Sequence, residues 1–104
     1  MKFDHAAICV KSISNSVEWF TSNLSAEILY CDETWAMLSV GNVKVALTLE
    51  SQHPPHLGFK VDSLSDMPSG ADVKKHRDGT SYVYKEDLDG NVIELIYYPE
   101  DTVD

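Results

Sequence analysis

The chain has 104 residues, 43% of them hydrophobic, and a formal net charge of −9 at pH 7. This length is that of a single domain, 1–104, and the apolar content is sufficient for a core. An acidic chain without a basic patch is not expected to bind nucleic acid. No apolar run approaches the roughly 18 residues of a membrane span, and the N-terminus lacks the apolar centre of a secretory signal. We therefore expect a soluble cytoplasmic protein whose acidic residues Glu100, Asp101 and Asp104 lie in a frayed tail.

The first half of the chain predicts the order strand, helix, strand, strand, strand. Alternation in the first strand places His5, Ala7 and Cys9 on one face. Apolar residues at spacings of three and four then predict an amphipathic helix. Turn residues, including Gly41-Asn42, separate the remaining strands. The expected bounds are 2–10 for the first strand, 12–24 for the helix, and 26–31, 34–40 and 43–50 for the later strands.

The paired prolines Pro54 and Pro55 end this first pattern, because they cannot lie inside a sheet ladder. The order then begins again, although Pro68 and Gly70 reduce the expected second helix to one turn at 62–67. The expected strands of this half are 56–61, 72–76, 80–86 and 91–98. Two related modules, 1–50 and 56–98, are therefore predicted, and the fold class is α+β.

Glu94 is out of place in the otherwise apolar last strand. A carboxylate buried in a small domain must be paired, hydrogen-bonded or bound to a cation, because an isolated buried charge is costly. Taken alone, Glu94 would form an ion pair with Lys60 or Lys74. His5 and His56, however, begin the equivalent strands of the two modules, so pseudo-twofold symmetry would bring them face to face.

Taken singly, each histidine is best interpreted as a satisfied structural side chain. The joint placement of His5, His56 and Glu94 instead favours a site of two imidazoles and one carboxylate, which suits a divalent metal and leaves positions open for a substrate. This ligand set accommodates Fe, Mn, Ni or Zn. The strand faces opposite the histidines carry Ile8, Val10, Leu57 and Phe59, and we expect those faces to pack on helices.

Four segments resemble the vicinal oxygen chelate superfamily, which includes glyoxalase I, fosfomycin-resistance transferases, extradiol dioxygenases and bleomycin-resistance proteins. They are DHAAICV at 4–10, EWF at 18–20, HLGFKV at 56–61 and DLDGNVIEL at 87–95. The resemblance covers nearly the whole chain. It implies two βαβββ modules that form an open, cup-shaped barrel, here with a shortened second helix, and it places the metal ligands on His5, His56 and Glu94.

The sequence departs from this family at several positions. Leu88 stands where a proline is usual in the turn. The fourth ligand of glyoxalase I would fall near Ala46 or Thr48, and alanine cannot bind a metal, which counts against glyoxalase I activity. Glu50 shares their face but lies near the strand end. The threonine expected after the first histidine of fosfomycin-type transferases is Ala7, and their late arginine is missing.

The resemblance also implies further site residues. Lys74 and Tyr84 fall at positions similar to the lysine and tyrosine of the fosfomycin-type enzymes and are the candidate catalytic residues. The histidine and tyrosine that assist proton transfer to oxygen in extradiol dioxygenases would correspond to His76 and to Tyr82 or Tyr84, although His53 and His76 are expected to lie in exposed loops or edges. The candidate substrate-binding residues are Ala7, Ala46, Thr48, Trp35 and Lys60.

Three functions follow from this resemblance. The first is a metal-dependent enzyme that chelates vicinal oxygens of a small substrate. The second is a metal-free binding protein of the bleomycin-resistance type, which would sequester a cationic or aromatic molecule; the charge and Trp19, Trp35 and Tyr84 favour it. The third is a retained fold without either activity. A homodimer is expected for the first two, because the thin second half would otherwise expose apolar sheet.

Overall fold

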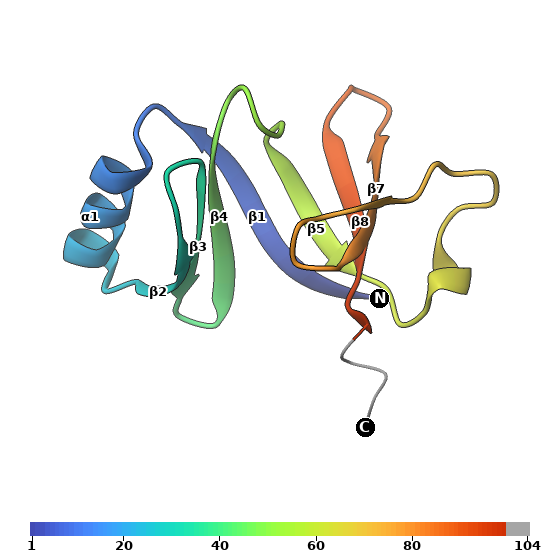
Figure 1. Ribbon diagram of the computed structural model, residues 1–104, viewed down its shortest axis with the longest axis horizontal. Coiled ribbons are helices and arrows are strands. Elements are labelled where there is room, and N and C mark those ends of the chain that lie inside the picture. Colours follow the sequence, from blue (N-terminus) through green and yellow to red (C-terminus); the bar gives the residue numbers. More distant parts are fainter. Residues whose placement is uncertain (100–104) are drawn as a thin grey trace. The chain divides into compact units, whose positions relative to one another are not determined.

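The computed structural model describes residues 1–99, which form two compact units (Figure 1). The first unit is residues 5–56, and the second unit is residues 1–4 and 57–99. Strand β1, Lys2–Val10, passes from the second unit into the first. None of the helical segments in this part of the chain has the length and apolar character needed to span a membrane. The acidic tail residues Glu100, Asp101 and Asp104 lie outside the described residues.

The first unit is a four-stranded sheet with one helix, and its elements follow the predicted order. The sheet order is β2-β3-β4-β1, with β1 parallel to β4 and the other neighbours antiparallel. The helix begins where the Ser12 hydroxyl accepts the Asn15 N–H, and it ends at Ser25, whose φ is +54°. Gly41, at φ +61°, supplies the left-handed residue that the β3–β4 turn needs. The bounds are α1 Ile13–Leu24, β2 Glu27–Cys31, β3 Trp35–Val40 and β4 Val43–Leu49.

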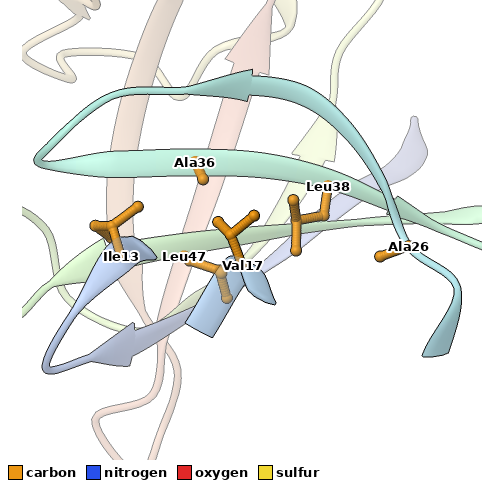
Figure 2. Close-up of a cluster of buried hydrophobic side chains, with 6 residues drawn as sticks. All are labelled: Ile13, Val17, Ala26, Ala36, Leu38 and Leu47. Atoms are coloured by element: carbon orange, nitrogen blue, oxygen red, sulfur yellow. The ribbon is translucent and has the colours of Figure 1, made fainter. Parts of the chain in front are cut away.

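One face of this sheet forms the core of the first unit with α1 (Figure 2). The helix contributes the stripe that its spacing predicts, and the strands contribute every second residue. Leu38 and Leu47 are completely buried. Burial of a leucine side chain stabilises a fold by about 1.5–3 kcal/mol, so these two residues are major contributors. The cluster is Ile13, Val17, Ala26, Ala36, Leu38 and Leu47.

The second unit is also built on four strands, in the order β5-β8-β7-β6, with β6, β7 and β8 antiparallel in turn. Two glycines with positive φ make its reversals, Gly79 between β6 and β7 and Gly90 between β7 and β8. Its core is a small cluster of Val61, Met67 and Val83. The bounds are β5 His56–Lys60, the 3-10 turn η1 Leu64–Asp66, β6 Lys74–Lys75, β7 Ser81–Glu86 and β8 Val92–Tyr97.

The α+β class and the order of elements are confirmed, but the prediction for the outer strand faces is partly wrong. Val10 packs on the first core as expected. Ile8 and Leu57 are instead 40% and 45% exposed. The reason for Ile8 is that α1 packs against β2, β3 and β4, which leaves the outer face of β1 largely open. Leu57 is exposed because η1, which stands where the second helix was expected, spans only three residues.

Candidate functional site

The face of the first-unit sheet opposite α1 carries His5 and is called the histidine face here. The β1–β4 register pairs His5 with Lys44, Ala7 with Ala46, and Cys9 with Thr48, so these side chains alternate onto one side. Three of the predicted substrate-binding residues on β1 and β4 therefore share a face with His5. They are Ala7, Ala46 and Thr48, and each is buried.

His5 and His56 contact each other in the first unit. Their Nε2 atoms lie 3.1 Å apart and their rings are nearly perpendicular, at 83°. Nδ1 of His56 lies 2.7 Å from the carbonyl oxygen of Pro54. A carbonyl oxygen only accepts, so the proton must be on Nδ1, and the Nε2 of neutral His56 presents a lone pair. Both histidines are buried, with His5 4% exposed and His56 9% exposed.

The connector before β5 is bonded to the histidine face. The Thr48 hydroxyl donates to the carbonyl oxygen of His53 at 3.4 Å, and the Cys9 thiol donates to the same oxygen at 3.5 Å. His53 lies in a loop, as predicted, but is half-buried rather than exposed. These bonds hold the segment that carries Pro54, and through it the orientation of His56.

Trp35 lies on the histidine face in the row of Thr48, its register partner. Its ring stacks on Tyr30, with 4.6 Å between centroids. The Tyr30 hydroxyl donates to Asp32 at 2.5 Å, and this bond, with the Thr34 amide, holds the pKa of Asp32 well below its usual range. Two stacked aromatic rings therefore lie beside a carboxylate that stays ionised.

The second unit carries Glu94 on one face of β7 and β8, called the glutamate face here. Glu94 is 1% exposed. Its register partner on β7 is Tyr84, and the next row joins Ile96, Tyr82 and Lys74. Alternation therefore places Glu94 and Ile96 on the same face of β8. Tyr84, predicted as catalytic, lies directly opposite the carboxylate, whereas Lys74 lies one row away and is exposed.

Glu94 is bonded to His76. Nε2 of His76 lies 2.7 Å from Oε2 of Glu94, and its ring stacks on Tyr82 with 3.7 Å between centroids and 9° between planes. The prediction that His76 is exposed is wrong, because its side chain is only 22% exposed. The sequence taken alone predicted Lys60 or Lys74 as the partner of Glu94. Alternation could have indicated His76, because it places Lys74 and His76 on the same side of a short hairpin strand.

The two tyrosines beside Glu94 are held in the neutral form. Burial raises the pKa of Tyr84 above 10, and electrostatic interactions with Glu94 and then with Tyr82 raise it further. Burial and then Glu94 likewise raise the pKa of Tyr82. At neutral pH both phenols are therefore hydrogen-bond donors and not bases.

Lys60, predicted as a substrate-binding residue, lies near the end of β5. Its Nζ is 5.6 Å from the centre of the Tyr98 ring, within the range of a cation–π contact. The Tyr98 hydroxyl donates to Asp4 at 2.8 Å. Burial raises the pKa of Tyr98, and the bond to Asp4 raises it further. Lys60 is thus placed against a neutral aromatic ring.

Comparison with solved structures shows that the fold is a known one. A glyoxalase/bleomycin resistance protein/dioxygenase superfamily member from Vibrio splendidus 12B01 is 16% identical, with a TM-score of 0.65 over 89% of this chain and 96% of that one. The methylmalonyl-CoA epimerase from Mycobacterium tuberculosis is also 16% identical, with a TM-score of 0.69 over 99% of this chain and 92% of that one. A variant epimerase from Streptomyces coelicolor, in complex with 2-nitronate-propionyl-CoA, is 16% identical and has a TM-score of 0.73 over 95% and 98%.

No protein-family model and no curated protein matches the chain. The structural similarity nevertheless extends over nearly the whole of both chains in each comparison. The chain therefore has the fold of the vicinal oxygen chelate superfamily.

Proposed function

We propose that this chain, which has the vicinal oxygen chelate fold, is a metal-dependent enzyme in which His5, His56 and Glu94 hold a divalent transition metal. The substrate would be a small molecule that presents two neighbouring oxygens. Similar folds support a small-molecule function, since the M. tuberculosis and S. coelicolor proteins are methylmalonyl-CoA epimerases. We further propose that the protein works as a homodimer in the cytoplasm.

The histidine pair carries this proposal. Two ligands at adjacent positions of one metal ion, each about 2.1 Å from it, lie about 3.0–3.4 Å apart. The Nε2 atoms of His5 and His56 are 3.1 Å apart. Metal-binding histidines usually donate their other ring N–H to a carbonyl or carboxylate, and Nδ1 of His56 does so to Pro54. The donor set therefore fits Fe, Mn, Ni or Zn.

Glu94 completes the proposed ligand set. It is an almost completely buried carboxylate in a strand of apolar residues, and its Oε2 is bonded to His76. Two imidazoles and one carboxylate leave coordination positions for a substrate. When bound, the metal would act as a Lewis acid that stabilises negative charge on a substrate oxygen.

The other residues of the two faces would bind and orient the substrate. Tyr84 is a neutral donor opposite Glu94, so its role would be to donate a hydrogen bond or a proton. Ala7 and Ala46 are neighbours on the histidine face and would form a wall of small side chains. Lys74, exposed on the glutamate face, and Lys60 would attract an anionic group of the substrate.

The direct test is the metal content of untagged protein, measured by elemental analysis. We expect about one equivalent of a divalent transition metal, lost in the variants His5→Ala, His56→Ala and Glu94→Ala. The control is Lys75→Ala, which changes an exposed residue of β6 and should leave the metal content unaltered. Unaltered metal content in all three ligand variants would exclude the site. Sedimentation of the wild-type protein tests the dimer.

A second candidate function is metal-free sequestration of a cationic aromatic molecule. The stacked Tyr30 and Trp35 rings beside ionised Asp32 favour it, because such rings bind planar cations. The planar cation ethidium should then raise the melting temperature of metal-stripped protein. Trp35→Ala should abolish this shift, whereas Trp19→Ala, on the exposed side of α1, should not. Equal shifts in both variants would remove this candidate.

A further inference from the structure

We propose that His76 is a positioning residue for Glu94, whose carboxylate it orients through the bond from Nε2 to Oε2. This inference rests on the proposed function, because it assigns Glu94 as a metal ligand. It adds a fourth residue to the machinery of the site, one that would act through Glu94 and not through contact with the substrate.

The bond has the properties of a strong orienting contact. Its length of 2.7 Å is at the short end of the range for a charge-assisted hydrogen bond between a nitrogen and a carboxylate. Glu94 is 1% exposed, so water competes little for the carboxylate. In a protected environment such a bond is stronger than it would be at the surface. The bond therefore restricts rotation of the carboxylate group.

The His76 ring is itself held in place. It lies flat against Tyr82, at 9° between planes. The backbone N–H of His76 donates to Thr80 and its carbonyl oxygen accepts from Gly79, which closes the hairpin. Asp78 accepts both the N–H and the hydroxyl of Thr80 at 3.0 and 2.7 Å. Because its hairpin and the stacked ring fix the imidazole, the imidazole can hold the Glu94 carboxylate in one orientation.

Two roles for His76 make opposite predictions about metal binding. A neutral imidazole that donates to Glu94 would hold the carboxylate ready for a cation, and its removal would weaken binding. Such outer partners of metal ligands typically contribute about 10–100-fold in affinity. A charged imidazole that neutralises Glu94 would compete with the cation, and its removal would tighten binding. The positioning role proposed for His76 is the first of these two.

The experiment is a Co²⁺ titration of metal-stripped full-length protein, followed by visible absorption. We expect His76→Ala to weaken Co²⁺ binding about 10–100-fold and to change the absorption band. His76→Gln keeps an N–H donor and should recover most of the affinity and the wild-type band. Lys75→Ala, an exposed neighbour of His76, should bind like the wild type. Tyr82→Leu removes the stacked ring and should give an intermediate loss.

The outcomes separate this inference from the function on which it rests. A wild type that binds no Co²⁺ would overturn both. A wild type that binds Co²⁺ while His76→Ala binds equally well or more tightly would overturn the positioning role alone. Melting curves of the metal-free variants identify any that do not fold. If His76→Ala is unfolded, then His76→Gln and Tyr82→Leu decide, and wild-type binding by Tyr82→Leu would overturn the inference.

Discussion

His5 and His56 are separated by 51 residues in the chain, yet their Nε2 atoms lie 3.1 Å apart. The two rings form a hydrogen bond in which the position of each ring proton is defined. Because Nδ1 of His56 donates to the Pro54 carbonyl, neutral His56 has an accepting Nε2, and His5 must donate from its own Nε2. When the proton leaves Nε2 of His5, the Nε2 atoms of both rings present lone pairs that can bind a cation.

This arrangement predicts the tautomers of both rings in metal-free protein at neutral pH. His56 should carry its proton on Nδ1 and His5 on Nε2. Long-range proton–nitrogen NMR correlations of the histidine side chains distinguish the two forms. A His56 ring protonated only on Nε2 would contradict the bond to Pro54. The His76→Gln variant simplifies the spectrum by removing one ring and should leave the tautomers of the pair unchanged.

The core of the first unit predicts a large cost for one truncation. Leu38 on β3 is completely buried in the cluster that β3 forms with α1. Leu38→Ala should therefore lower the free energy of unfolding by about 2–5 kcal/mol, because it removes buried apolar surface and leaves a cavity. Leu29 on β2 is 54% exposed, and Leu29→Ala should change stability by no more than about 0.5 kcal/mol. Urea unfolding measures both. Similar losses would be incompatible with this core.

The C-terminal end of α1 predicts a stabilising substitution. Ser25 has a φ of +54° and a ψ of 36°, a left-handed conformation that costs residues other than glycine about 1–2 kcal/mol. Glycine loses more chain entropy on folding, so Ser25→Gly should raise stability by about 0.5–1 kcal/mol. Ser22→Gly, inside the helix, should lower it by about 0.5 kcal/mol. Thermal melting should show a higher melting temperature for Ser25→Gly than for the wild type and a lower one for Ser22→Gly.

Tyr98 predicts a loss of stability at alkaline pH. Burial and the bond to Asp4 raise the pKa of Tyr98 in the folded protein above its ordinary value of 10.0. The folded state therefore holds this proton more tightly than the unfolded state, and the resulting stability is present below pH 10 and decreases as the pH rises above it. Tyr98→Phe should make stability less dependent on pH between about 10 and 11. Chemical unfolding at several pH values measures the slope, and an unchanged slope would count against the bond to Asp4.

The local pattern of the chain determined most of the fold and the three residues of the proposed metal site. Periods of two and three to four residues identified the helix and the strands, because alternation and helical spacing are properties of neighbouring residues. Glu94 was recognisable because a carboxylate in an apolar strand needs a partner. His5 and His56 were recognisable because they occupy equivalent positions in strands of the two predicted modules.

The tertiary structure alone decided which residues these groups contact. His76 lies 18 residues from Glu94, and the hairpin register that brings it to Oε2 depends on backbone bonds around Gly79 that composition does not reveal. The exposure of Ile8 depends on which strands α1 covers. The bond from His56 to Pro54 depends on the path of the connector. Periodicity determines which face of a strand a residue occupies, whereas contacts arise from long-range packing, and only the folded chain defines them.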